Sequence, residues 1–268
     1  MSQDKDESAP VKVLFLAANP AMTTRLALDV EMREIEQKVR ASKYRDALVF
    51  QLAWAVRPDD LLQLFNQHQP QIVHFSGHGS EQGLRFASED GDVRLVATPV
   101  LKQLFAVCKG TVRLVFLNAC SSQAQAQALL ETVDCVIGMK EAIHDVTAAT
   151  FASSFYSAIG FGQSVQTAFE QGIVALRLNG STEAHVPELL VKEGIDAKTV
   201  VLIAPGPPLL SVWMVPSRRN TYFTGREDVL THIHARFTSD RAAVLTQGQA
   251  INGLGGIGKT QIAVEYVY

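Results

Sequence analysis

Cysteine is scarce in this 268-residue sequence, and its three cysteines, Cys108, Cys120 and Cys135, form no CxxC pair. An odd number without such spacing argues against a disulfide framework and a structural zinc site, and it favours a reducing cytoplasm. The sequence also lacks an apolar run of the roughly 18–20 residues that span a bilayer. Its net charge of −3 leaves no basic excess for binding nucleic acid or an anionic membrane. Residues 1–10 are polar and acidic, so they lack the basic start of a secretory signal and are predicted to be a disordered tail.

The sequence does contain short apolar runs that alternate with helical patterns. Apolar residues make up 47% and charged residues 19% of the chain, which is typical of a globular protein with a substantial core. Continuous short apolar runs favour parallel strands that helices cover on both faces. The predicted strands are residues 11–18, 48–56, 71–76, 112–117, 135–139 and 199–204.

Helices are predicted between these strands. In residues 28–39 one stripe recurs at helical spacing and consists of Leu28, Glu31, Met32, Ile35 and Val39. Pro58 and Pro99 suit the first positions of two further helices, with Thr98 as the N-cap of the second. Two apolar runs around Asp90-Gly91 predict a hairpin within residues 83–97, and two consecutive helices are predicted at residues 147–159 and 164–178.

This α/β alternation stops at a proline-rich stretch that begins at Pro205 and contains Pro207, Pro208 and Pro216. Such a composition predicts a semi-rigid linker. We therefore expect four segments: the tail at 1–10, one α/β domain at 11–204, the linker at 205–221, and a C-terminal segment at 222–268.

Two of the predicted strands end at residues with reactive side chains. The run IVHFSGHG places His74 inside a strand and His78 after it, and LNACSS places Cys120 just after another strand. Ligands bind at the carboxyl ends of the strands in an open parallel sheet. We therefore expect His78 to face a substrate and His74 to be packed under a helix.

Cys120 also precedes a segment of good helix formers, with Ser121 or Ser122 as its N-cap. The helix dipole and a nearby imidazolium both favour a thiolate, and the histidine can then protonate a leaving amine. The backbone N–H groups of Gly79 and Cys120 are candidates for an oxyanion hole. These residues together predict a cysteine–histidine hydrolase. Cys108 and Cys135 lie in apolar runs and are expected to be packing residues.

Several motifs in chain order resemble the CHAT domain, a caspase-like module of the caspase–separase superfamily. They are LFLAANP, DVEMREI, AVRPDDLLQLF, IVHFSGHG, VFLNACSS and FASSFYSAIGFGQSVQTAF. The histidine lies 42 residues before the cysteine (120 − 78), close to the spacing of about 50 in caspases. The resemblance implies a three-layer caspase-like α/β fold with a mainly parallel sheet, and peptide-bond hydrolysis by a His78–Cys120 dyad. Many CHAT domains are activated only within larger proteins, so whether this fragment is latent stays open.

Related peptidases often hold a basic P1 side chain with an acidic residue, and the resemblance offers two candidates after the cysteine. Asp134 precedes the strand at 135–139, and Asp145 lies in IHDVTAAT. An ordinary position at a helix N-terminus is the alternative explanation for Asp145.

The sequence ends close to a second motif, GLGGIGKT, which matches the P-loop pattern G-x-x-x-x-G-K-[ST]. Backbone N–H groups around Gly253 and Gly258 would hold phosphates, Lys259 would reach the β- and γ-phosphates, and Thr260 would ligate Mg²⁺. With YFTGRED upstream, residues 222–268 resemble the opening of an NB-ARC-type (STAND) signalling ATPase. Because only eight residues follow Thr260, ATP or ADP with Mg²⁺ is expected only in the full-length protein. The peptidase itself is expected to need no cofactor or metal.

Three functions stay open at this point. The first is a cytoplasmic cysteine endopeptidase effector that acts on a protein or peptide and is controlled by an adjoining ATPase, through which the full-length protein forms homo-oligomers. The second is a non-catalytic interaction module with the same fold. In the third, the ATPase is the main actor and the α/β domain regulates it. The presence of both His78 and Cys120 favours the first.

Overall fold

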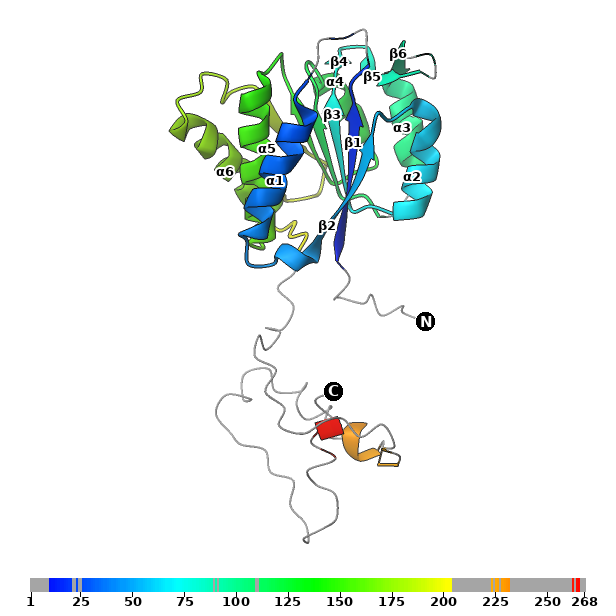
Figure 1. Cartoon of the computed structure of the whole chain (residues 1–268), viewed down its shortest axis with the longest axis vertical. Coiled ribbons are helices and arrows are strands. Elements are labelled where there is room, and N and C mark those ends of the chain that lie inside the picture. The colour runs from blue at the N-terminus through cyan, green and yellow to red at the C-terminus, as the bar shows by residue number, and fades with distance from the viewer. Residues whose placement is uncertain are drawn as a thin grey trace. The chain divides into compact units, whose positions relative to one another are not determined.

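The structure is a computed structural model that describes residues 10–20, 23, 26–88, 90, 92–108, 111–203, 223, 225–226, 228–231, 262 and 264–265. The chain divides into two units, Met1–Pro207 and Pro208–Tyr268. Every helix and strand labelled in Figure 1 belongs to the first unit. The segment boundaries expected from the sequence stay predictions.

The centre of the first unit is a six-stranded sheet in the order β2-β1-β3-β7-β8-β9. Neighbouring strands are parallel from β2 to β8, whereas β9 is antiparallel to β8. The apolar runs predicted as its first five strands are confirmed. The strands are β1 (Val11–Ala18), β2 (Leu48–Trp54), β3 (Ile72–Gly77), β7 (Leu114–Asn118), β8 (Cys135–Met139) and β9 (Pro187–Val191).

Helices cover both faces of this sheet, as Figure 1 shows. One face carries α1 (Leu28–Arg40), α5 (Asp145–Gly160) and α6 (Val165–Leu178), and the other carries α2 (Leu61–His68), α3 (Thr98–Val107) and α4 (Gln123–Leu129). Short 3₁₀ turns at Arg45–Ala47 and Pro58–Asp60 precede β2 and α2. The strands are apolar on both faces because successive side chains point into different layers.

A smaller antiparallel sheet follows β3 directly. It consists of β4 (Gly79–Ser80), β5 (Gly83–Ala87) and β6 (Val93–Ala97), in that order. The predicted hairpin within residues 83–97 is confirmed, with Gly83 opposite Ala97. This sheet therefore occupies the chain immediately after His78.

The predicted strand at residues 199–204 is wrong for the residues that the structure describes. Within residues 199–203 only Val201 forms an isolated bridge, with Ser164. The last strand of the sheet is instead β9. It begins at Pro187, a residue that disfavours a strand prediction, and its other residues are half-buried. β9 occupies the edge of β8 that the later apolar run was predicted to close.

The predicted N-cap of α3 is also wrong. Ala97 holds that position, and the Thr98 hydroxyl donates a 3.4 Å hydrogen bond to the carbonyl of Gln82. Pro58 begins a 3₁₀ turn and not the α-helix itself, which starts at Leu61. Both differences shift a helix start by one to three residues.

A row of stacked rings crosses the centre of the sheet. Phe15, His74 and Phe116 lie opposite one another on β1, β3 and β7. The His74 ring centroid is 4.7 Å from that of Phe15 and 4.5 Å from that of Phe116. From α5, the rings of Phe155 and Tyr156 pack on Phe116. This cluster holds the α5 layer against the strands that carry the candidate dyad.

We expect Phe116→Ala to lower the free energy of unfolding by about 3–5 kcal/mol, because it empties a fully buried site. Phe161→Ala is the matched control, since Phe161 is 47% exposed, and it should cost less than about 1 kcal/mol. Urea denaturation followed by circular dichroism measures both changes. Equal losses for the two variants would contradict this description of the core.

Candidate active site

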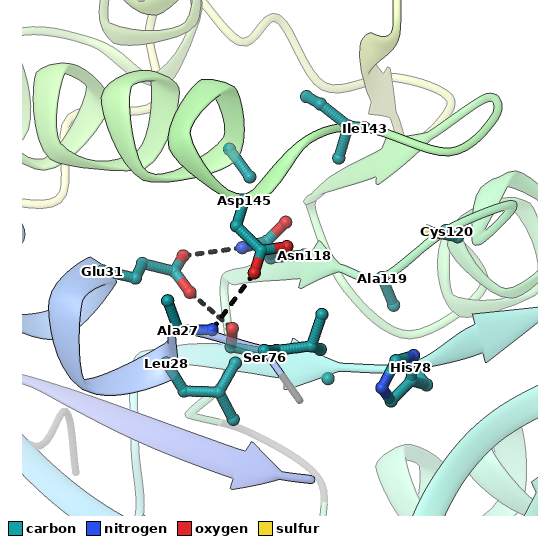
Figure 2. A pocket seen from close by; sticks show the side chains of 13 residues that line it. Ala27, Leu28, Glu31, Ser76, His78, Asn118, Ala119, Cys120, Ile143 and Asp145 are labelled. Carbon is teal, nitrogen blue, oxygen red and sulfur yellow. Dashed lines mark hydrogen bonds between the residues drawn. The ribbon is translucent and has the colours of Figure 1, made fainter. Parts of the chain in front are cut away.

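The ends of β3 and β7 bring the predicted dyad together. The two strands are parallel neighbours, and Ser76 opposite Asn118 is their last registered pair. His78 and Cys120 each lie two residues beyond that pair. Parallel strands end at the same edge of a sheet, and both residues line one pocket, around which they are labelled in Figure 2.

Gly79 allows the two loops to touch. A Cβ atom at this position would lie 2.7 Å from the carbonyl oxygen of Cys120 and 3.0 Å from the Cβ of Ala119. A Cβ contact of 2.7 Å with a backbone oxygen essentially never occurs in proteins, so the close approach of the histidine loop to the cysteine loop requires glycine. The Gly79 backbone therefore lies directly beside Cys120.

The chain turns sharply after Cys120. Ser121 has a φ of 51°, in the left-handed region that side chains disfavour, and α4 begins two residues later at Gln123. Ser122 occupies the predicted N-cap position, but its hydroxyl does not cap the helix. It donates to the carbonyl of Leu117 at 3.3 Å and accepts from the N–H of Met139 at 3.0 Å. Cys120 itself is half-buried at the end of the strand.

The helix that follows Cys120 also holds the loop that follows His78. The buried side chain of Gln125 in α4 donates hydrogen bonds to the carbonyls of Ser80 (3.0 Å) and Glu81 (3.2 Å). It also donates to the hydroxyl of Thr98 at 3.0 Å. The two loops are thus joined both at Gly79 and through α4.

The other two cysteines are poor candidates for a nucleophile. Cys135 is fully buried in β8, and burial, together with the charge of Asp134, raises the pKa of its thiol to about 11. Burial also raises the pKa of the Cys108 thiol. Both cysteines pack against the apolar core, as the sequence predicts.

His74 is fully buried and does not reach the pocket. Its Nδ1 lies 3.2 Å from the hydroxyl of Tyr156, and its Nε2 lies 3.2 Å from Oε1 of Glu31. The second contact is within ion-pair distance but not in hydrogen-bond geometry, so Nε2 has no hydrogen-bond partner among the described residues. Burial and the charge of Glu31 raise the pKa of Tyr156 well above its ordinary value, so the phenol stays protonated.

Sequence reasoning missed Glu31, which forms the floor of the pocket. Its carboxylate accepts hydrogen bonds from the hydroxyl of Ser76 and, at 2.8 Å, from the side-chain amide of Asn118 (Figure 2). A signal was present, because Glu31 lies in the apolar stripe of α1, between Leu28 and Ile35. A charged residue on the buried face of an amphipathic helix indicates an internal polar partner.

The structure brings only one of the two candidate acidic residues to the pocket. Asp145 begins α5 and lines the pocket, where its Oδ2 accepts a 3.1 Å hydrogen bond from the N–H of Ala27. Asp134 lies before β8, at the opposite end of the sheet, and pairs with Arg113 at 3.1 Å. The structure therefore does not bring Asp134 to this pocket, because the residue before a parallel strand lies at the edge away from the site.

The pocket encloses about 400 Å³, part of it open to solvent. It is lined by Leu26, Ala27, Leu28, Glu31, Ser76, Gly77, His78, Asn118, Ala119, Cys120, Ile143, Asp145 and Ala148. Its polar side chains come from the strand ends and from Glu31 and Asp145 on the two helices, and its apolar side chains come mainly from α1, α5 and the segments before them.

The P-loop residues Gly253, Gly258, Lys259 and Thr260 lie outside the described residues. Within the residues that are described, no group of three or more histidine, cysteine or acidic side chains could hold a metal ion. No helix in the same part of the chain is long and apolar enough to cross a membrane.

Comparison with known proteins identifies the family of this chain. Residues 3–223 match the family described as CHAT domain. The chain belongs to the CHAT family. A probable protease of Gillisia limnaea is 23% identical over 172 residues, which cover 62% of this chain and 30% of that protein. A protein named Roc-COR-CHAT protease, from an unknown prokaryotic organism, is 26% identical over 153 residues, covering 54% of this chain and 14% of its own length.

The fold of the CHAT domain is also found in a solved peptidase. The crystal structure of the Arg-specific cysteine proteinase gingipain R matches with a TM-score of 0.52 at 14% identity, over 73% of this chain and 48% of that one. The mixed α/β fold with a mainly parallel sheet is thus similar to that of caspase-like cysteine peptidases. The chain thus shares a domain family with a protein named as a CHAT protease, and its fold is similar to that of a solved cysteine proteinase.

Two histidine–glutamate pairs hold the segment that leads into Asp145. His144 lies before α5, and its Nδ1 is 2.6 Å from Oε1 of Glu183. Nε2 of His185 is 2.8 Å from Oε1 of Glu141. Burial alone would raise the pKa of Glu183, but hydrogen bonds from Thr147 and His144 outweigh it and lower that pKa below its ordinary value of 4.5.

We expect Glu183 to stabilise the CHAT domain in a pH-dependent way. Because its pKa is lower in the folded state, its contribution is complete above pH 4.5 and is lost as the pH falls through the folded-state value. Glu183→Gln should therefore lower the thermal midpoint at pH 7 and have little effect at the lowest pH at which the protein still folds.

Thermal denaturation of both proteins over that pH range measures the difference. Glu193→Gln, a substitution of an exposed glutamate, is the control and should show no such dependence. A difference between wild type and Glu183→Gln that stays constant with pH would contradict the role given to Glu183.

Proposed function

We propose that the CHAT domain is a cysteine endopeptidase in which Cys120 is the nucleophile and His78 the general acid and base. The main support is the register of β3 and β7, which puts both residues two positions beyond the same strand pair. The contact of Gly79 with the Cys120 carbonyl supports the same assignment, because it brings the two loops together.

In the proposed reaction His78 takes the thiol proton of Cys120, and the sulfur attacks the carbonyl carbon of the scissile bond. Backbone N–H groups of Gly79 and Cys120 stabilise the oxyanion that forms. As the C–N bond breaks, His78 gives its proton to the leaving amine. Water then transfers a proton to His78 while its oxygen attacks the thioester, and the departing sulfur takes that proton back.

We further propose that the substrate carries a basic side chain at P1, which Asp145 holds. Asp145 lines the same pocket as the dyad and is half-buried, so a carboxylate oxygen can meet an incoming cation. The similar fold of an Arg-specific proteinase supports this choice of charge. The hydrogen bond from Ala27 fixes the carboxylate at the start of α5.

The match of residues 253–260 to the P-loop pattern supports a second proposal, which rests on sequence alone. In the full-length protein an NB-ARC-type ATPase would bind ATP or ADP with Mg²⁺, form homo-oligomers and control the peptidase. The three free cysteines support a cytoplasmic location. A non-catalytic interaction module is the alternative function of the CHAT domain.

Substitution of either dyad residue should abolish peptide hydrolysis. We expect Cys120→Ala and His78→Gln to lower kcat/KM by roughly 10³-fold or more, because a nucleophile and its base act as a unit. Cys108→Ala is the matched control and should retain activity. A library of fluorogenic peptides measures all three variants. Unchanged hydrolysis by Cys120→Ala would disprove the mechanism, and a folded wild type that cleaves no peptide would favour the interaction module.

Asp145→Asn should weaken the selection of basic substrates. Asparagine can still accept the hydrogen bond from Ala27 but has no charge. We expect kcat/KM for peptides with arginine or lysine at P1 to fall roughly 10-fold or more, since a charge-assisted hydrogen bond contributes about 1.5–3 kcal/mol. Peptides with an uncharged P1 residue are the control and should be cleaved as before. A loss that is the same for both peptide classes would refute the role of Asp145 in P1 recognition.

A further inference from the structure

The side chain of Glu31 lies beneath the candidate dyad, and the proposed mechanism does not use it. Glu31 is 3% exposed, and a buried carboxylate is costly unless donors surround it. One oxygen accepts from the hydroxyl of Ser76, and the other accepts from the amide of Asn118 at 2.8 Å. This second oxygen also lies 3.2 Å from Nε2 of His74.

The two donors occupy a particular place in the sheet. Ser76 and Asn118 form the last registered pair of β3 and β7, and each lies two residues before a member of the dyad. The carboxylate of Glu31 therefore bridges both strands at the point where their ladder of backbone hydrogen bonds ends, as the dashed lines in Figure 2 show.

Helix α1, which carries Glu31, is itself fixed near both ends. Near its start the N–H of Ala27 donates to Asp145, and near its end Nζ of Lys38 donates to the hydroxyl of Ser154 at 2.8 Å. Both acceptors belong to α5, against which α1 packs. The carboxylate is consequently held by α1 and α5, which are separate from the two loops.

We propose that Glu31 is a positioning residue for the dyad: it holds the ends of β3 and β7 in register, so that His78 faces Cys120. The inference rests on the proposed peptidase function of the same pair. Reacting groups must be aligned closely, and a displacement of about 1 Å costs roughly 10²-fold in rate. A carboxylate suits this task because it accepts hydrogen bonds from both strands at once.

Glu31 does not serve as a second carboxylate for a basic substrate. Both of its oxygens already accept hydrogen bonds from the protein, and its side chain is almost completely buried. Asp145 differs, because it is half-buried and lies at the wall of the pocket. The two carboxylates of this pocket therefore have separate roles, one toward the strands and one toward the substrate.

An exchange of hydrogen-bond polarity tests the proposal on the full chain. Glu31→Gln places an amide near the amide of Asn118, and Asn118→Asp places a second carboxylate near that of Glu31. The double variant restores one donor and one acceptor, with the same total charge as the wild type. Glu36→Gln is the control, because Glu36 lies on the same helix with its side chain 41% exposed.

Each single variant should lower kcat for peptide hydrolysis roughly 10-fold or more, with little change in KM, and the double variant should recover most of this loss. The control should behave like the wild type. Thermal denaturation must show that each variant is folded at the assay temperature, because loss of stability alone lowers the active fraction and leaves kcat per folded molecule unchanged. If Glu31→Gln does not fold, Ser76→Ala removes one of the two bridges and should lower kcat in the same way.

Full kcat in Glu31→Gln, or no recovery in the double variant, would overturn the proposal. The rate at which iodoacetamide alkylates Cys120, followed by peptide mass spectrometry, separates this result from failure of the peptidase function. If the wild type cleaves no peptide, the proposed function fails, but alkylation still reports on Glu31. We expect the alkylation of Cys120 to be slower in Glu31→Gln than in the wild type and to approach the rate in His78→Gln. An alkylation rate in Glu31→Gln equal to that of the wild type would overturn the positioning role.

Discussion

The parallel pairing of β3 with β7 is the constraint on which the rest of the site depends. Neither strand carries a complete site, since His78 follows one and Cys120 follows the other. Their register places Ser76 opposite Asn118, and both candidate residues come two positions after that pair, at the same edge of the sheet. Glu31, Gly79 and Gln125 each contact the ends of these strands or the loops that follow them.

The core beneath the dyad combines apolar packing with a few polar groups. The ring of His74 is stacked between Phe15 and Phe116, and its nitrogens face Tyr156 and Glu31. An apolar cluster of the same volume would avoid the desolvation of these groups. The buried polar atoms instead give the strand ends directional contacts, which apolar side chains do not provide.

Two kinds of contact then connect the loops above the strands. Gly79 meets Cys120 through the backbone, and Gln125 links the helix after the cysteine to the chain after the histidine. On the other side, Asp145 joins the start of α5 to the start of α1. The segment before Asp145 is held in turn by Glu183 through His144. Asp145 and Glu31, the two acidic residues that line the pocket, are thus connected through the contacts of α1 and α5.

The sequence by itself determined the α/β class and five of the six strands of the main sheet, and it predicted His78 and Cys120 as the candidate dyad. It could do so because buried parallel strands are continuous apolar runs and because reactive residues follow them directly. It did not reveal β9, a strand of five residues that begins with a proline. Nor could it separate Asp145 from Asp134, since both are acidic residues beside predicted elements.

Only the tertiary structure decided which strands are neighbours, and therefore which residues share the pocket. Asp134 and Asp145 flank the same strand and turn, but one lies at the amino end of β8 and the other beyond its carboxyl end. Glu31 is distant from Asn118 in the chain, and the hydrogen bond between them follows from the packing of α1 on the sheet. Local sequence patterns report the period and length of an element, whereas strand order depends on contacts between segments far apart in the chain.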